Sequence, residues 1–197
     1  MIGTLINRIF PKVLAGSGIE TGAFLKDVLY YFGLDRQTEK ICRFGKTAMG
    51  PNLTPRQAIV LAALATESGA EYAPVQVQKL FFLIDENVSA AFGGKQFSFE
   101  PYDYGPFDSA VYHELDTLAR MGFVRIESKG PSAGHRRYVL TPAGQDVGAT
   151  NLSTMDISLR DYLTRVSAWV RSLSFAQLVG SIYKAYPPMR VNSVFRG

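Results

Sequence analysis

The segment GFVRIESKGPSAGHRRYVLTP, residues 122–142, decides the fold that the sequence predicts. Residues 123–127 and 135–140 have the β-branched and aromatic composition of short strands. The loop between them, residues 128–134, consists mainly of Ser, Gly and Pro, which favour turns. The segment therefore predicts a β-hairpin. Thr141-Pro142 then begins a helix, because Thr is a good N-cap and Pro suits the first helical position.

Two helices are predicted on the N-terminal side of the hairpin. The first covers residues 55–67 and begins with the same Thr-Pro pair. The second runs from Pro74 to Phe92 with apolar residues at helical spacing, and Gly93-Gly94 ends it. The expected inward face of the first helix comprises Ile59, Val60, Leu64 and Ala65.

Three further signals lie between the second helix and the hairpin. Residues 97–102 alternate like a short strand, Tyr104-Gly105-Pro106 indicates a turn, and Asp108 or Ser109 caps a third helix. The order helix, helix, strand, helix, hairpin is that of a winged helix, with the hairpin as the wing. We therefore expect a mostly helical α+β protein with a winged-helix-like domain at residues 54–149.

The spacing of apolar residues in 150–197 predicts a C-terminal helical segment. An apolar stripe at helical spacing runs from Leu159 to Leu173. Ser174 then caps a further helix that extends through Ala185. Such a stripe has to be covered. Either the domain of the same chain covers it or a second copy does, which would make a homodimer through the C-terminal helices.

Residues 1–53 precede the regular pattern and form a Gly-rich N-terminal extension with one helical patch at residues 24–32. Two interpretations of this extension are open. In the first, translation truly starts at Met49, and the extension is a loosely ordered segment that results from reading the gene from an upstream start. In the second, the chain starts at Met1, and the extension adds a helix that packs on the domain.

Composition favours a cytoplasmic protein without membrane association. The chain of 197 residues is 47% hydrophobic and 19% charged, as in ordinary globular proteins. Its apolar runs fall short of the roughly 20 residues of a membrane span, and no secretory signal is recognisable. The single cysteine, Cys42, suits a reducing compartment.

The net charge of +4 is unevenly distributed along the chain. Residues 49–149 carry eight Lys and Arg against eleven Asp and Glu, a net charge of −3. Because non-specific DNA affinity comes mainly from neutralised phosphates, the overall positive charge is weak evidence for DNA binding.

Side chains that carry catalysis or metal binding are sparse. His113, His135 and Cys42 are the only His and Cys residues and lie far apart in the sequence, whereas a metal site needs several close ligands. We expect a non-enzymatic protein with no catalytic residue, metal or cofactor.

Lys79 is the one unusual charged residue, because it lies between apolar residues on a mostly buried helix. The favoured interpretation is structural: its stem follows the core and its ammonium reaches the surface. The alternative is that the ammonium meets a carboxylate such as Asp103 and fixes the turn at residues 104–106.

Four motifs resemble one known family: VQKLFFL at 77–83, FEPYDYGPF at 99–107, VYHEL at 111–115 and LARMGFV at 118–124. Their order and spacing resemble the SocA-like antitoxins, the Panacea domain group, and their YwgA-like relatives. The resemblance covers roughly residues 54–149, and the long N-terminal extension departs from it. It implies an antitoxin or adaptor that binds a partner protein, such as a toxin encoded nearby, and neutralises it or delivers it to a protease. The family signature falls on Lys79, Tyr104, Gly105 and Pro106.

Two kinds of partner are open. For a protein partner, Tyr102 and Phe107 complete the candidate surface if they are exposed, because aromatic side chains anchor interfaces. For DNA, the candidates are Arg125, Lys129, His135, Arg136 and Arg137 on the wing and His113 and Arg120 on the third helix.

The third helix argues against DNA. Asp108, Glu114 and Asp116 lie close to its basic residues and would repel phosphates. About fourteen residues also separate it from the second helix, whereas a helix-turn-helix has about three to four. We therefore favour the protein partner.

Overall fold

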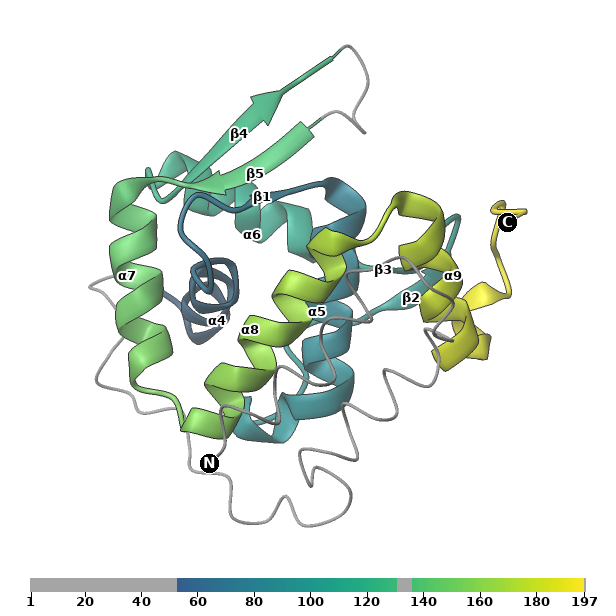
Figure 1. Cartoon of the computed structure of the whole chain (residues 1–197), viewed down its shortest axis with the longest axis horizontal. Helices are drawn as coiled ribbons and strands as arrows, with labels where there is room; N and C mark the ends of the chain where they lie inside the picture. Colours follow the sequence, from purple (N-terminus) through teal and green to yellow (C-terminus); the bar gives the residue numbers. More distant parts are fainter. Residues whose placement is uncertain (1–52, 131–135, 197) are drawn as a thin grey trace, which may run out of the picture. The chain divides into compact units, whose positions relative to one another are not determined.

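The computed structural model describes residues 53–130 and 136–196, and it confirms a mostly helical α+β fold with a small sheet (Figure 1). The expectations for the N-terminal extension, with its helical patch, Cys42, Met1 and Met49, and for His135 lie outside the described residues. In chain order the elements are α4 (Pro55–Leu64), β1 (Glu71–Tyr72), α5 (Pro74–Val88), a 3-10 turn (Ser89–Phe92), β2 (Glu100–Tyr102), β3 (Gly105–Phe107), α6 (Ser109–Arg120), β4 (Val124–Ser128), β5 (Arg136–Leu140), α7 (Pro142–Ser153), α8 (Ile157–Ser172), α9 (Phe175–Ala185) and a second 3-10 turn (Pro187–Arg190).

The predicted hairpin is confirmed as β4 and β5, which pair antiparallel. β1 pairs with the other edge of β5, so the strand order is β1-β5-β4. β1 was not predicted, because a strand of two residues is too short to show alternation. At the base of the hairpin, the Thr141 hydroxyl accepts a hydrogen bond from Gly144 N at 3.1 Å and donates one to the Gly122 carbonyl at 2.7 Å. Thr141 thus caps α7, as predicted, and closes the hairpin.

The predicted strand at 97–102 and turn at 104–106 are partly wrong. The strand is shorter, the turn is Asp103-Tyr104, and the residues that follow begin a second strand, β3. Pro101 of β2 faces Pro106 of β3. Antiparallel pairs alternate between exchanging hydrogen bonds and exchanging none, and two prolines, which have no N–H, suit the second kind. Pro106 is therefore a strand residue and not a turn residue.

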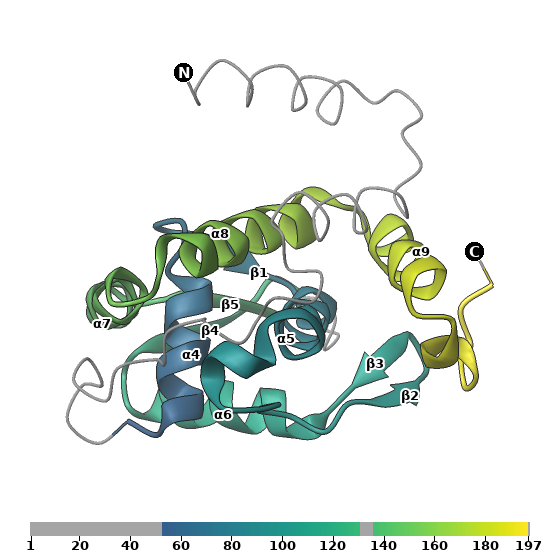
Figure 2. The ribbon, with the colours of Figure 1, turned by 90° about the horizontal axis from the view of Figure 1, so that it is seen from below.

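α4 is the central helix, with α6, α7 and α8 packed around it (Figure 2). Thr54 caps it and forms a reciprocal pair of hydrogen bonds with Gln57, at 3.0 and 3.2 Å. Every residue from Gln57 to Ala65 is buried, and not only the predicted inward face. A helix covered on several sides needs no polar face, which explains its almost wholly apolar sequence.

The apolar stripe of α8 packs on α5 and α4 of the same chain. Leu163, Val170 and Ser167 are fully buried there. The Ser167 hydroxyl lies 2.5 Å from the Tyr72 hydroxyl, so α8 also contacts β1 at the edge of the sheet. Among the described helices, none has the length and apolar character that a membrane crossing requires.

Gly148 of α7 lies so close to α4 that a Cβ at this position would be 2.5 Å from the Leu61 carbonyl oxygen and from Ala65 Cβ. We expect Gly148→Ala to push the two helices apart and to lower the free energy of unfolding by about 1–3 kcal/mol, measured by urea denaturation. The matched control is Gly180→Ala in α9, where an added Cβ meets no atom within 4 Å. It should gain about 0.5–1 kcal/mol from helix propensity. Equal changes in both variants would contradict the close packing of α7 on α4.

Candidate functional site

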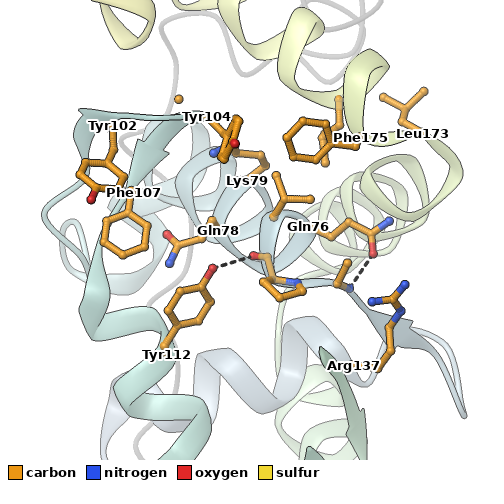
Figure 3. A pocket seen from close by; sticks show the side chains of 15 residues that line it. Gln76, Gln78, Lys79, Tyr102, Tyr104, Phe107, Tyr112, Arg137, Leu173 and Phe175 are labelled. Carbon is orange, nitrogen blue, oxygen red and sulfur yellow. Dashed lines mark hydrogen bonds between the residues drawn. The ribbon is translucent and has the colours of Figure 1, made fainter. Parts of the chain in front are cut away.

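The N-terminal half of α5, the β2–β3 hairpin and the start of α9 enclose a pocket of about 430 Å³ (Figure 3). α6 contributes Tyr112 to its wall and β5 contributes Arg137. Five of the six residues predicted for partner binding line the pocket: Lys79, Tyr102, Tyr104, Gly105 and Phe107. The sixth, Pro106, does not line it, but its carbonyl oxygen accepts a hydrogen bond from Lys79.

Both interpretations of the sequence gave the Lys79 ammonium the wrong surroundings, although the second was right that Lys79 bonds to the segment 104–106. Its side chain is only 3% exposed, so the ammonium does not reach the surface. The Nζ atom donates a hydrogen bond to the Pro106 carbonyl oxygen at 2.9 Å, instead of meeting the carboxylate of Asp103. The partner is a backbone carbonyl, which sequence patterns cannot indicate.

The Lys79 ammonium has no counter-ion in the described residues. No carboxylate among them lies within the 4.0 Å of an ion pair with this residue. Burial alone lowers the pKa of Lys79 to about 7, because a cation loses its hydration in the interior without a compensating negative charge. Near neutral pH the amine therefore exists in both its charged and its neutral form.

Gln78, the neighbour of Lys79 on α5, provides a second anchor for the hairpin. Its side-chain amide donates to the Asp108 carbonyl oxygen at 2.9 Å and accepts from Asp108 N at 3.1 Å. The Asp108 carboxylate in turn caps α6 by accepting from Ala110 N. Gln78 was not predicted as a site residue, although a polar residue inside an apolar helical stretch is a signal of such a role.

Gly105 is required where the hairpin approaches Lys79. Its φ of +93° lies in the left-handed region that side chains disfavour. An added Cβ would lie 3.2 Å from Tyr183 Cε1 and 3.5 Å from Lys79 Nζ. The left-handed backbone and the close approach to the Tyr183 ring therefore both favour glycine here, whereas a Cβ would meet Lys79 only at ordinary contact distance.

Aromatic side chains form the rim of the pocket (Figure 3). Tyr102 is 53% exposed and packs on Phe107 with ring centroids 5.1 Å apart. Tyr104 is 45% exposed and forms a T-shaped pair with Phe175, which is 43% exposed, with ring centroids also 5.1 Å apart. Phe175 begins α9 and lies far from the hairpin in sequence, so no local pattern could have assigned it to this rim. Of the two residues whose exposure was expected to mark a protein-contact surface, Tyr102 is exposed and Phe107 is only partly exposed.

The basic residues of the wing are largely engaged with other groups. Arg125 forms an ion pair with Glu127 at 2.6 Å, and Lys129 with Glu71 of β1 at 2.5 Å. Arg137 lines the pocket and donates to the Arg136 carbonyl oxygen at 2.7 Å.

On α6, the two basic candidates for DNA contact are exposed on either side of an acid. His113 and Arg120 face solvent, and so does Asp116 between them. Arg120 donates to the Thr117 hydroxyl at 2.9 Å. Among the described candidates, an acid thus separates the two on α6, and Arg125 and Lys129 on the wing are paired with acids.

The described residues hold no group of three or more His, Cys, Asp or Glu side chains placed to bind a metal ion. In comparisons with known proteins, no family model matches the chain and no curated protein matches its sequence. The resemblance to SocA-like antitoxins therefore stays a prediction.

The buried lysine predicts how stability depends on pH. An unfolded lysine has a pKa of about 10.4, whereas Lys79 has a pKa of about 7 in the fold. Between these values the unfolded state binds more protons, so the free energy of unfolding should rise with pH. Well below pH 7 both states are protonated, and this effect is constant. The slope should approach about 1.4 kcal/mol per pH unit between pH 7.5 and 9.5.

Urea denaturation of the wild type and Lys79→Met over this range measures the effect. The variant should lose this part of the slope, and Lys95→Met, at an exposed lysine paired with Glu86, should keep it. The range stops at pH 9.5 because burial raises the pKa of Tyr112 to about 12, and such tyrosines favour unfolding at higher pH. Identical slopes in the wild type and Lys79→Met would show that Lys79 is solvated.

Proposed function

We propose that this chain is a non-enzymatic protein-binding module that holds a partner protein at the pocket between α5, the β2–β3 hairpin and α9. The observation that carries the proposal is the exposure of Tyr102, Tyr104 and Phe175 together around the pocket that Lys79 lines. Large exposed aromatic side chains around a pocket are typical anchors of protein interfaces. The hairpin is fixed to α5, so a partner meets a preformed surface, which lowers the entropic cost of binding.

The scaffold in this proposal is a winged helix with an inserted hairpin. Its helices would be α4, α5 and α6, and its wing would be β4–β5. The pairing of β1 with β5 supports this assignment, because β1 follows the first of these helices and joins the sheet of the wing. The β2–β3 hairpin occupies the place of the short turn of a helix-turn-helix, so the binding surface is built on the insertion.

The resemblance of residues 54–149 to SocA-like antitoxins supports the kind of partner. In this proposal the partner is a cytoplasmic protein, such as a toxin encoded nearby, which the module neutralises or delivers to a protease. The signature residues of the resemblance, Lys79, Tyr104, Gly105 and Pro106, are those that fix the hairpin or line the pocket.

The two alternatives have less support. DNA binding through the wing would require Arg125 and Lys129 to leave Glu127 and Glu71. A homodimer through the C-terminal helices would need a free apolar stripe, but the stripe of α8 is buried within its own chain.

The proposal is tested by retention of partner proteins on the tagged full chain in lysate of its native host after nuclease treatment. Tyr102→Glu and Tyr104→Glu replace exposed rings, so they should leave the fold intact and reduce retention of the specific partner at least tenfold. The matched control, Ile157→Glu, changes a residue of α8 that is 71% exposed and outside the pocket, and it should retain the partner like the wild type.

Partner retention that is the same in all four proteins would remove the pocket from partner binding. Salt-dependent binding of duplex DNA, lost in an Arg136→Ala and Arg137→Ala double variant, would favour the DNA-binding alternative.

A further inference from the structure

We infer that the pocket binds the C-terminal carboxylate of a partner polypeptide, with the Lys79 ammonium as its counter-ion. This inference rests on the proposed function, because it names the chemical group of the partner that enters the pocket. The supporting observations are a cation without an ion pair among the described residues, the charges and side chains of the wall, and the burial of the cation.

Lys79 has bonding capacity to spare. An ammonium group has three N–H donors, and the Pro106 carbonyl oxygen accepts from one of them. No carboxylate of the described residues forms an ion pair with this group. Burying a cation without an anion costs much free energy, and burying it beside an anion costs much less. A ligand carboxylate would supply both the missing charge and acceptors for the remaining donors.

The wall of the pocket selects for negative charge. Its lining contains no Asp, Glu or His, and it contains a second cation, Arg137 from β5. Besides the two cations, the titratable groups that line the pocket are tyrosines: Tyr102 and Tyr104 of the hairpin and Tyr112 of α6. The ring of a fourth, Tyr183 of α9, lies against Gly105. Phenol groups can donate hydrogen bonds to a carboxylate and are neutral near pH 7.

The depth of the cation favours a chain end over a side chain. Lys79 is nearly fully buried, so the anion has to pass the aromatic rim to reach it. A chain end enters as a single strand, whereas an internal Asp or Glu requires the chain to enter and leave again. The volume of about 430 Å³ is that of a pocket for a small ligand. Leu173, Leu178 and Phe175 in the wall favour apolar terminal residues.

Calorimetric titration of the full chain with acetyl-Leu-Phe tests the inference. The same peptide with an amidated C-terminus removes the charge, and acetyl-Leu-Glu-Phe-amide moves it to an internal position. We expect the free acid to bind at least tenfold more tightly than either amide at pH 7. At pH 8.5, where Lys79 with its pKa of about 7 is mostly neutral, binding of the acid should take up close to one proton. Titrations in two buffers with different protonation enthalpies measure this uptake.

Lys79→Met should remove both the preference for the acid and the proton uptake, and Lys95→Met should keep them. The proton uptake is measured on the wild type, so the test does not depend on the folding of a variant. Equal binding of acid and amide, or no binding, without proton uptake would overturn the carboxylate site. Equal binding of the internal glutamate peptide would overturn the chain-end assignment. Neither outcome affects the partner retention that tests the proposed function through Tyr102 and Tyr104.

Discussion

The hydrogen bond from Lys79 to the Pro106 carbonyl joins the buried helix α5 to a hairpin whose strands have only three residues each. A two-stranded hairpin of this length is not stable on its own. Its position therefore depends on anchors outside it. Gln78 holds the exit of the hairpin at Asp108, and Val194 N from the C-terminal tail donates to the Asp103 carbonyl at its tip. Because the hairpin carries Tyr102 and Tyr104, the shape of the pocket follows from these anchors.

A buried ammonium is an unusual choice for such an anchor. Its desolvation costs free energy that an apolar side chain of similar size would not, and the depressed pKa of Lys79 expresses this cost. In the complex that we propose, the carboxylate of the partner restores the missing charge. Binding and protonation of Lys79 then become linked, so partner affinity should fall as the pH rises above neutrality. In this account Lys79 thus both holds the hairpin in position and provides the positive charge that binds the carboxylate.

Local signals in the sequence were sufficient to predict most of the helices and the β4–β5 hairpin. Thr54, Asp108, Thr141 and Ser174 cap their helices as expected, because an N-cap is set by residues within one turn of it. β1 and β3 were missed for opposite reasons. β1 is too short to show a pattern, and the Gly-Pro pair that begins β3 has the composition of a turn.

The pocket could be predicted only in part. Lys79, Tyr102, Tyr104, Gly105 and Phe107 belong to two neighbouring segments and were found from motifs. Phe175 and Arg137 reach the pocket through long-range packing, which leaves no local trace in one sequence. The partner of Lys79 was missed because it is a backbone carbonyl and the expected partner was a carboxylate.

The most direct test of the central claim is the titration of the Lys79 amine itself by NMR, in full-length protein with lysine labelled at the side-chain carbon and nitrogen. A buried, uncompensated ammonium predicts one lysine resonance, absent in Lys79→Met, that titrates with a pKa of about 7. Titration of every lysine near the ordinary pKa of about 10.4 would show that Lys79 is hydrated or already paired with an anion, and would contradict the buried, uncompensated charge on which the carboxylate pocket depends.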